Sequence, residues 1–200
     1  ARPRGPGPAG HRAPRRGGLA GRGPARARAS RDAADLLKLT VQDPVPPPPR
    51  TELAELRDLW HARIPLSAAL ELEPLRFADH ALELRAPLHP NRNVHDTGFA
   101  GSLYAAAVLC GWGLVHLELA RAGLPGTVVV ARAGIEYLRP VTGDFRCRCG
   151  VSAPALTAAL DALRSRGRCR LELTVDIDVE GDTTGSAARL TGSYAVRGTA

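Results

Sequence analysis

The feature that most constrains this sequence is a long apolar stretch in the middle of the chain. Residues 99–115 carry no charged side chain, and the apolar pattern continues to Arg121. Gly123 and Pro125, which stop helices, follow directly. The pattern therefore predicts one long helix from about Phe99 to Arg121. Such a helix is apolar on all sides, so the rest of the chain must cover it.

A membrane-spanning helix is the competing interpretation of this stretch. The uncharged run has 17 residues, whereas crossing a bilayer takes roughly 20. His116, Glu118 and Arg121 follow at once, and we expect His116 and Glu118 to face solvent or a partner subunit. Strand patterns on both sides also favour a core helix, so we expect no membrane insertion.

The segments around the helix have the periodicity of a half-buried sheet. Apolar residues at helical spacing in 53–60 predict a short helix that ends before Pro65. Residues 154–166 predict a second one, stopped by Gly167. Six segments alternate apolar and polar side chains and are predicted strands, the first two forming a hairpin: 70–77, 80–87, 127–138, 145–151, 168–180 and 186–197.

These elements predict an α+β fold. An antiparallel sheet of about six strands, apolar on one face and curved around the long helix, would supply the cover that the helix needs. This arrangement is called a hotdog fold. We assign it to residues 51–200.

The basic charge of the chain is confined to its first part. The net charge is +7, but residues 1–31 hold nine arginines and no acid, and residues 32–200 carry a net −2. With only 4% aromatic residues, nothing favours a nucleic-acid partner. Residues 1–50 are rich in Arg, Pro and Gly and are predicted to be a disordered tail. An organellar targeting peptide is the alternative; otherwise we expect a cytoplasmic protein.

The four cysteines do not indicate a metal site. Cys147 and Cys149 form a CxC pair without a second pair at zinc spacing. They share a strand face with apolar residues, which is typical of core positions. We therefore expect free thiols in a reducing compartment, no metal and no other cofactor.

Polar residues gather where the chain enters the long helix. This loop-to-helix junction contains Asn91, Asn93, His95, Asp96, Thr97, Gly98, Gly101 and Ser102. The first N–H groups of a helix have no partner inside it and attract a carbonyl oxygen or an anion. The junction is therefore the predicted site of chemistry.

Four sequence runs resemble a known family. PLHPNRN at 87–93, TGFAGSL at 97–103, GWG at 111–113 and YLRPVTGDF at 137–145 are similar to the thioesterase-like domain at the C-terminus of YiiD-type proteins. That domain is a branch of the hotdog thioesterase superfamily. The resemblance covers about residues 64–197. It implies a homodimer that joins its sheets edge to edge and hydrolyses acyl-coenzyme A or acyl-carrier-protein thioesters at the interface.

Within this interpretation each junction residue receives a predicted role. The backbone N–H groups of Gly101 and Ser102 would polarise the thioester carbonyl. Asp96 would be the base or nucleophile, and Asn93 or His95 would assist the water. The predicted substrate-binding residues are Asn91, Thr97, Phe99 and Arg139, the last as a partner for a coenzyme A phosphate.

Structural roles compete with the catalytic ones. The asparagines and Thr97 would equally tie down the loop, Asp96 would serve as a helix N-cap, and His95 and Arg139 would be exposed charges. Other hotdog thioesterases carry the acid about two turns into the helix, where this chain has Leu109 and Cys110.

Three alternatives compete with this interpretation. A Ser102-centred triad lacks the GxSxG context. A hydratase or dehydratase would use His95 as its base but normally needs the missing helix acid. A non-catalytic module would bind the thioester without hydrolysing it.

Overall fold

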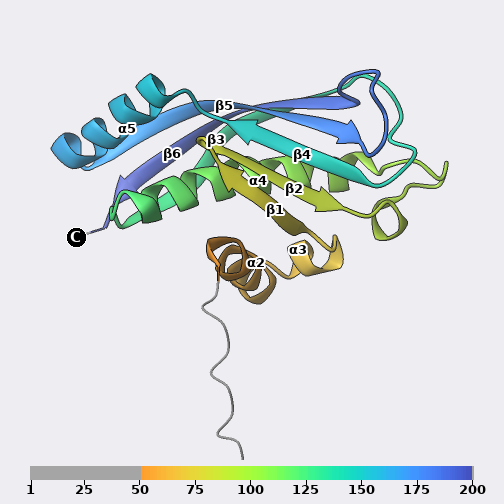
Figure 1. The fold of residues 1–200 in the computed structure, drawn as a ribbon, viewed down its shortest axis with the longest axis horizontal. Helices are drawn as coiled ribbons and strands as arrows, with labels where there is room; N and C mark the ends of the chain where they lie inside the picture. The colour runs from red at the N-terminus through yellow and green to blue at the C-terminus, as the bar shows by residue number, and fades with distance from the viewer. Residues whose placement is uncertain (1–50, 200) are drawn as a thin grey trace, which may run out of the picture. The chain divides into compact units, whose positions relative to one another are not determined.

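The computed structural model describes residues 51–199, so the predicted tail at 1–50 lies outside the described residues. The elements run in the order α2 (Glu52–Arg63), α3 (Pro65–Ala69), β1 (Glu73–Ala78), β2 (Ala81–Ala86), the 3₁₀ turn η1 (His89–Asn91), α4 (Ala100–Arg121), β3 (Gly126–Tyr137), β4 (Phe145–Gly150), α5 (Ala153–Arg166), β5 (Arg168–Val179) and β6 (Ala188–Gly198). The strands form a single antiparallel sheet in the order β1-β2-β4-β5-β6-β3. The predicted hotdog fold is confirmed, with the sheet curved around α4 (Figure 1).

The chain up to the first strand differs from the prediction in two places. Pro65, which was expected only to end a helix, also begins the short helix α3. Proline is favoured in the first turn because its missing N–H would be unpaired there anyway. The turn after α3 places Glu71 at φ 52°, so β1 begins at Glu73 rather than at residue 70.

The predicted hairpin forms with a two-residue turn. Asp79 and His80 have φ values of 53° and 57°, as in the turn type whose twist matches that of paired strands. The other predicted strands agree with the structure to within two residues. In β5 the side chains alternate as expected, and those from Leu171 to Val179 on the odd-numbered face are buried.

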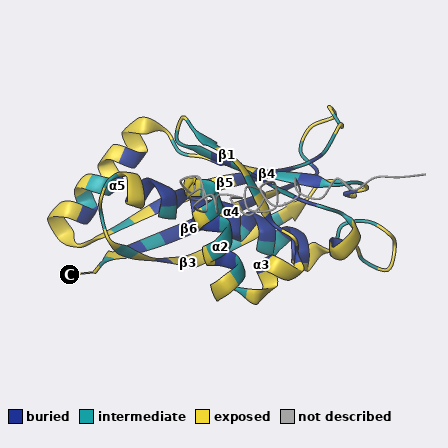
Figure 2. Ribbon diagram, turned by 60° about the horizontal axis from the view of Figure 1, so that its bottom comes forward, coloured by how far each residue is buried: buried dark blue, intermediate teal, exposed yellow. Residues whose placement is uncertain are grey.

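Helix α4 is the centre of the core. By length and composition it could cross a membrane, but 67% of its most apolar window is buried within the fold, and Figure 2 shows the buried positions gathered on α4 and the inner face of the sheet. Two glycines allow neighbouring aromatic rings to approach the helix closely. A Cβ atom on Gly111 would lie 2.3 Å from the Tyr194 hydroxyl oxygen, and one on Gly113 would lie 2.6 Å from the Trp60 ring.

The far end of α4 corrects one expectation. Glu118 was expected to face solvent or a partner, yet it is 5% exposed. Its carboxylate is 3.0 Å from the ring Nδ1 of His80 at the tip of the first hairpin. Burial of a carboxylate requires such a partner. His116 is half-buried and stacks on Trp112, with ring centroids 4.9 Å apart.

Cys147 and Cys149 lie on the buried strand face that the sequence pattern predicted. All four cysteines are free, and Cys110, Cys147 and Cys149 are buried. Burial raises the pKa of each of these thiols, that of Cys149 to about 12, because a thiolate is poorly solvated in the core. Cys169 is partly exposed.

Candidate active site at the loop before the central helix

The loop before α4 is held to the rest of the domain by Asn91. Its side chain is 1% exposed, and its amide nitrogen donates to the carbonyls of Leu70 and Pro87 at 2.9 and 2.8 Å. The backbone carbonyl of Asn91 accepts a hydrogen bond from the N–H of Phe99 at 2.7 Å. Asn91 therefore ties both ends of the loop, at Pro87 and Phe99, to Leu70 in the turn before β1. The structure shows this anchoring contact, and the predicted contact with substrate stays a prediction.

Asn93 organises the tip of the loop. Its amide nitrogen donates to the Thr97 hydroxyl at 3.0 Å and to the Gly98 carbonyl at 3.3 Å. Its side-chain oxygen accepts the backbone N–H groups of His95 and Thr97 at 2.8 and 3.3 Å. The Asn93 amide and the Thr97 hydroxyl are thus used inside the loop in this conformation. A catalytic part for Asn93 would require that one of these bonds open.

Helix α4 begins without a side-chain cap. Phe99 is the N-cap residue, and the first bond of the helix is from Leu103 N–H to the Phe99 carbonyl at 3.0 Å. Within residues 51–199, the N–H groups of Ala100, Gly101 and Ser102 have no acceptor. These donors, at the positive end of the helix dipole, can bind an oxygen that carries negative charge.

Close packing of glycine fixes the position of this helix start. Gly98 donates its N–H to the Val141 carbonyl at 2.7 Å, and a Cβ on Gly98 would lie 2.9 Å from Val141 Cβ. A Cβ on Gly101 would instead meet the ring of Phe99 at 2.5 Å. Phe99 is 52% exposed. The backbone at Gly101 is therefore open to an incoming group that displaces the Phe99 ring.

Asp96 and His95 lie at the exposed tip of the loop. Asp96 has a left-handed backbone, φ 58°, and its carboxylate is 3.3 Å from Arg92 with 83% of the side chain exposed. It does not cap α4, so the alternative of a helix cap is wrong. His95 is exposed as well, and its only hydrogen bond in the described part of the chain is from its backbone N–H to the Asn93 side-chain oxygen. Their catalytic roles stay predictions.

Arg139 and Ser102 complete the predicted set. The Arg139 guanidinium donates to the Asp182 carboxylate and to the Gly185 carbonyl in the loop between β5 and β6. It therefore braces that loop, and its predicted contact with a phosphate remains untested. Ser102 is 8% exposed, and its hydroxyl has no hydrogen bond among the described residues, including none to His95 or Asp96. A preformed triad is absent from this region.

Tyr137 was not among the predicted site residues, yet it reaches the helix start. Its hydroxyl donates to the Ala100 carbonyl at 2.8 Å, and its ring is 49% exposed beside the exposed Leu138. Partial burial and the nearby Tyr104 raise the pKa of Tyr137. Since residues 100 and 137 meet only through the pairing of β3 with the rest of the sheet, no local sequence signal could have indicated this contact.

Residues 53–198 match the family described as "Putative thioesterase (yiiD_Cterm)". The chain belongs to this family. The match covers nearly all the described residues, and the loop-to-helix junction lies inside it. This YiiD_C domain folds as a six-stranded sheet around one long helix.

Solved structures support the same assignment of this YiiD_C domain. A crystal structure described as the putative thioesterase from Shewanella oneidensis is 34% identical, covers 72% of this chain and 96% of its own, and has a TM-score of 0.62. A protein of unknown function from Chlorobaculum tepidum is 29% identical with a TM-score of 0.69, covering 72% and 93%. A thioesterase from Haemophilus influenzae shares the fold at 18% identity and a TM-score of 0.53, covering 74% and 92%.

Proposed function

We propose that this protein hydrolyses acyl thioesters of coenzyme A or of an acyl carrier protein. The observation that carries the proposal is the start of α4, where the N–H groups of Gly101 and Ser102 have no acceptor among the described residues. It lies inside a domain of a thioesterase family. A thioester carbonyl oxygen placed there would receive two hydrogen bonds that strengthen as charge develops on it.

The reaction needs little beyond this polarisation and one activated water. Water oxygen attacks the carbonyl carbon, the oxyanion forms at the helix start, and the C–S bond then breaks to leave a thiol and a carboxylic acid. Asp96 is the proposed base that takes the proton of the water. Its exposed position on the loop tip leaves its carboxylate free to approach a bound substrate, at the expense of the exposed pair with Arg92.

The edge of the sheet supports a homodimer. β3 is an outer strand of 12 residues, and its outer row of backbone groups has no partner strand among residues 51–199. The opposite edge strand, β1, has only six residues and contains Pro74 beside a register irregularity, both of which discourage pairing. β3 is therefore the proposed dimer edge, and its end at Tyr137 brings the interface beside the start of α4.

The activity test measures thiol release from a panel of acyl-coenzyme A esters with the full chain. We expect hydrolysis, and light scattering should give the mass of a dimer. Binding without release would favour the non-catalytic module, and addition of water to an enoyl thioester would favour the hydratase. Either outcome would overturn the proposed hydrolysis.

A matched pair of variants tests the base. Asp79 resembles Asp96 in backbone and surroundings: φ is 53° against 58°, the side chain is 86% against 83% exposed, and each pairs with an arginine. Asp96→Asn should lower kcat by about 100-fold or more if Asp96 is the base, whereas Asp79→Asn should change kcat less than about twofold. Equal rates for the two variants would remove Asp96 from the mechanism.

The backbone donors are tested by removing an N–H group. Proline is tolerated in the first turn of a helix, so Ser102→Pro deletes the donor at a position where the helix can still form. Loss of one oxyanion donor costs roughly 100- to 1,000-fold in kcat. Ser102→Ala retains the N–H and should lose far less. Both variants lack the hydroxyl, so an equal loss of kcat in Ser102→Ala and Ser102→Pro would show that the hydroxyl acts instead.

A further inference from the structure

A concave surface lies far from the junction, between helix α5 and the outer face of the sheet. This groove is a cavity of about 950 Å³ lined by residues of α5, β5, β6 and β3. Its volume is in the range of small-molecule sites. The groove touches β3 at Thr127 and Val129, near the start of the strand, whereas the junction meets Tyr137 at its end. Eight to ten residues of strand separate them, or about 26 to 33 Å.

Charge distinguishes this groove from the rest of the domain. Four arginines line it, namely Arg166, Arg168, Arg170 and Arg197, and no acidic side chain does. Of the 16 arginines in residues 51–199, ten form ion pairs with carboxylates. The four groove arginines belong to the remaining six. They form neither an ion pair nor a side-chain hydrogen bond within that part of the chain.

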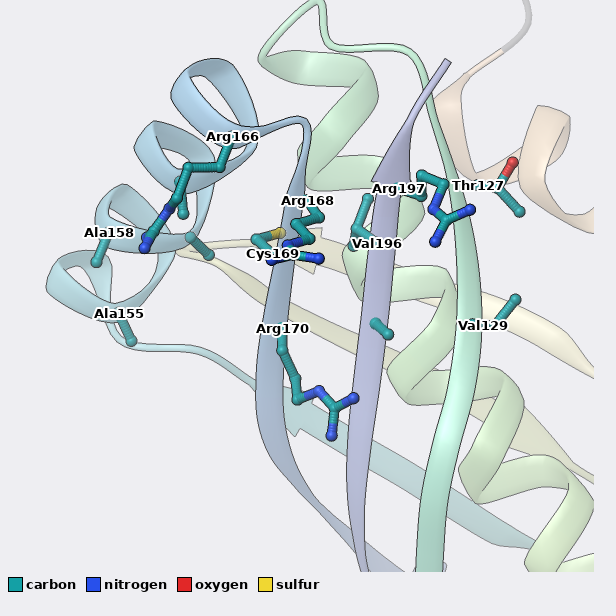
Figure 3. A pocket seen from close by; sticks show the side chains of 13 residues that line it. Thr127, Val129, Ala155, Ala158, Arg166, Arg168, Cys169, Arg170, Val196 and Arg197 are labelled. Atoms are coloured by element: carbon teal, nitrogen blue, oxygen red, sulfur yellow. The ribbon is translucent and has the colours of Figure 1, made fainter.

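The strand register places two of these charges opposite each other. Arg168 on β5 is the direct cross-strand partner of Arg197 on β6, and Arg170 follows two positions along the same face. Like charges opposite each other on a sheet destabilise it. Figure 3 shows Arg168, Arg170 and Arg197 on the two neighbouring strands, with Arg166 on the α5 side of the groove. An anion bound between them would relieve the repulsion.

The uncharged walls of the groove limit what kind of anion fits. α5 contributes four alanines, Ala155, Ala158, Ala159 and Ala162, and Ala195 on β6 lies between Arg170 and Val129 on the two neighbouring strands. Short side chains keep the concavity open between the guanidinium groups. A flat membrane surface or an acidic protein face would contact protruding charges, whereas this arrangement encloses a small molecule. Guanidinium groups at several points suit phosphates, which they bind bidentately.

We propose that this groove binds a small molecule carrying two or more phosphate groups. Two sources share that chemistry: the nucleotide end of a coenzyme A thioester and a free nucleoside polyphosphate. For the first source, antiparallel pairing of two β3 edges would bring the start of one strand, with its groove, beside the end of the other. Binding of the coenzyme A nucleotide therefore rests on the dimer put forward under the proposed function, whereas binding of a free nucleoside polyphosphate does not.

Binding is measured by calorimetry with the full chain, using coenzyme A, 3′,5′-ADP, ATP and inorganic pyrophosphate as probes. Arg168→Ala/Arg197→Ala should weaken binding at least tenfold. The control Arg63→Ala/Arg164→Ala removes the same charge from outside the groove and should change affinity less than twofold. Tighter binding of coenzyme A and 3′,5′-ADP than of ATP would identify the nucleotide end of coenzyme A as the ligand. Tighter binding of ATP would identify a free nucleoside polyphosphate.

Cys169 supplies a readout that does not depend on hydrolysis. It lines the groove and is the only partly exposed cysteine, so a bound phosphate compound should slow its alkylation in the wild type but not in the double variant. Arg170→Glu should abolish the protection, and thermal unfolding checks that each variant is folded. The proposal would be overturned if the groove and control variants bound the probes with equal affinity, or if a bound probe did not slow the alkylation of Cys169. Binding only to anionic vesicles or to an acidic carrier protein would overturn it as well. Absence of thiol release would refute only the hydrolysis.

Discussion

Replacement of Gly111 by alanine tests the close contact between the central helix and the sheet. The new Cβ would lie 2.3 Å from the hydroxyl oxygen of Tyr194 and 2.4 Å from its Cζ. The Tyr194 ring is 0% exposed and donates to the Val108 carbonyl at 3.2 Å. The ring must therefore shift within a packed core, because it cannot turn into solvent.

Three terms set the expected loss of stability. Overpacking costs about 1–3 kcal/mol, and the Tyr194 hydrogen bond contributes about 1 kcal/mol. The higher helix propensity of alanine returns about 1 kcal/mol. The close approach places the overpacking cost at the upper end, so we expect a net loss of roughly 3 kcal/mol, or about 10 °C in Tm for a domain of this size.

The control is the same substitution at the start of the same helix. A Cβ on Gly101 would meet the Phe99 ring at 2.5 Å, but Phe99 is 52% exposed and can rotate away. Gly101→Ala should therefore stay within about 0.5 kcal/mol of the wild type. Urea unfolding followed by circular dichroism measures both variants. If Gly111→Ala were no less stable than Gly101→Ala, the reasoning about the buried ring would be refuted.

Three further measurements address other parts of the domain. Burial lowers the pKa of His116, so as the pH drops the imidazole takes up a proton in the unfolded chain before it does in the folded one. Stability should therefore fall below about pH 6.5. The difference in Tm between pH 8 and pH 5.5 should be smaller in His116→Gln than in the wild type. Alkylation of the native protein should modify Cys169 rapidly and the other three thiols only after unfolding, as counted by mass spectrometry; rapid labelling of all four would contradict the core packing. Asn91→Ala leaves the carbonyls of Leu70 and Pro87 without their side-chain donor, and urea unfolding should show a loss of about 2 kcal/mol or more.

The parts of the fold that were predicted correctly depend on local patterns. The central helix was placed to within one residue because glycine and proline end it. β5 was predicted because its side chains alternate without interruption. The start of β1 was wrong because Leu70 and Leu72 alternate like strand residues, although both are buried through the turn after α3. Alternation over two residues does not distinguish a strand from a buried turn.

The candidate site shows the same limit more strongly. Sequence alone located the polar loop and the start of the helix, but not which polar groups are already bonded inside the loop. Asn93 and Arg139 are engaged with chain neighbours, and Tyr137 reaches the helix from 37 residues away. Glu118 was misplaced because a helix that is apolar all round gives no indication of its exposed side. Its partner His80 lies in a hairpin 38 residues earlier.

The order of the elements along the chain has a consequence for synthesis on the ribosome. α4 ends at Arg121, but β4, β5 and β6, which cover much of it, are complete only at Gly198. When translation has just passed Arg121, this helix, apolar enough to enter a membrane, has only α2, α3 and the first hairpin of the fold beside it. The other strands are added over the next 77 residues, up to Gly198. A growing chain of this kind exposes its most aggregation-prone surface before the residues that hide it exist. Ribosome-bound chains that stop between β3 and β5 should therefore bind chaperones, and chains extended beyond β6 should release them.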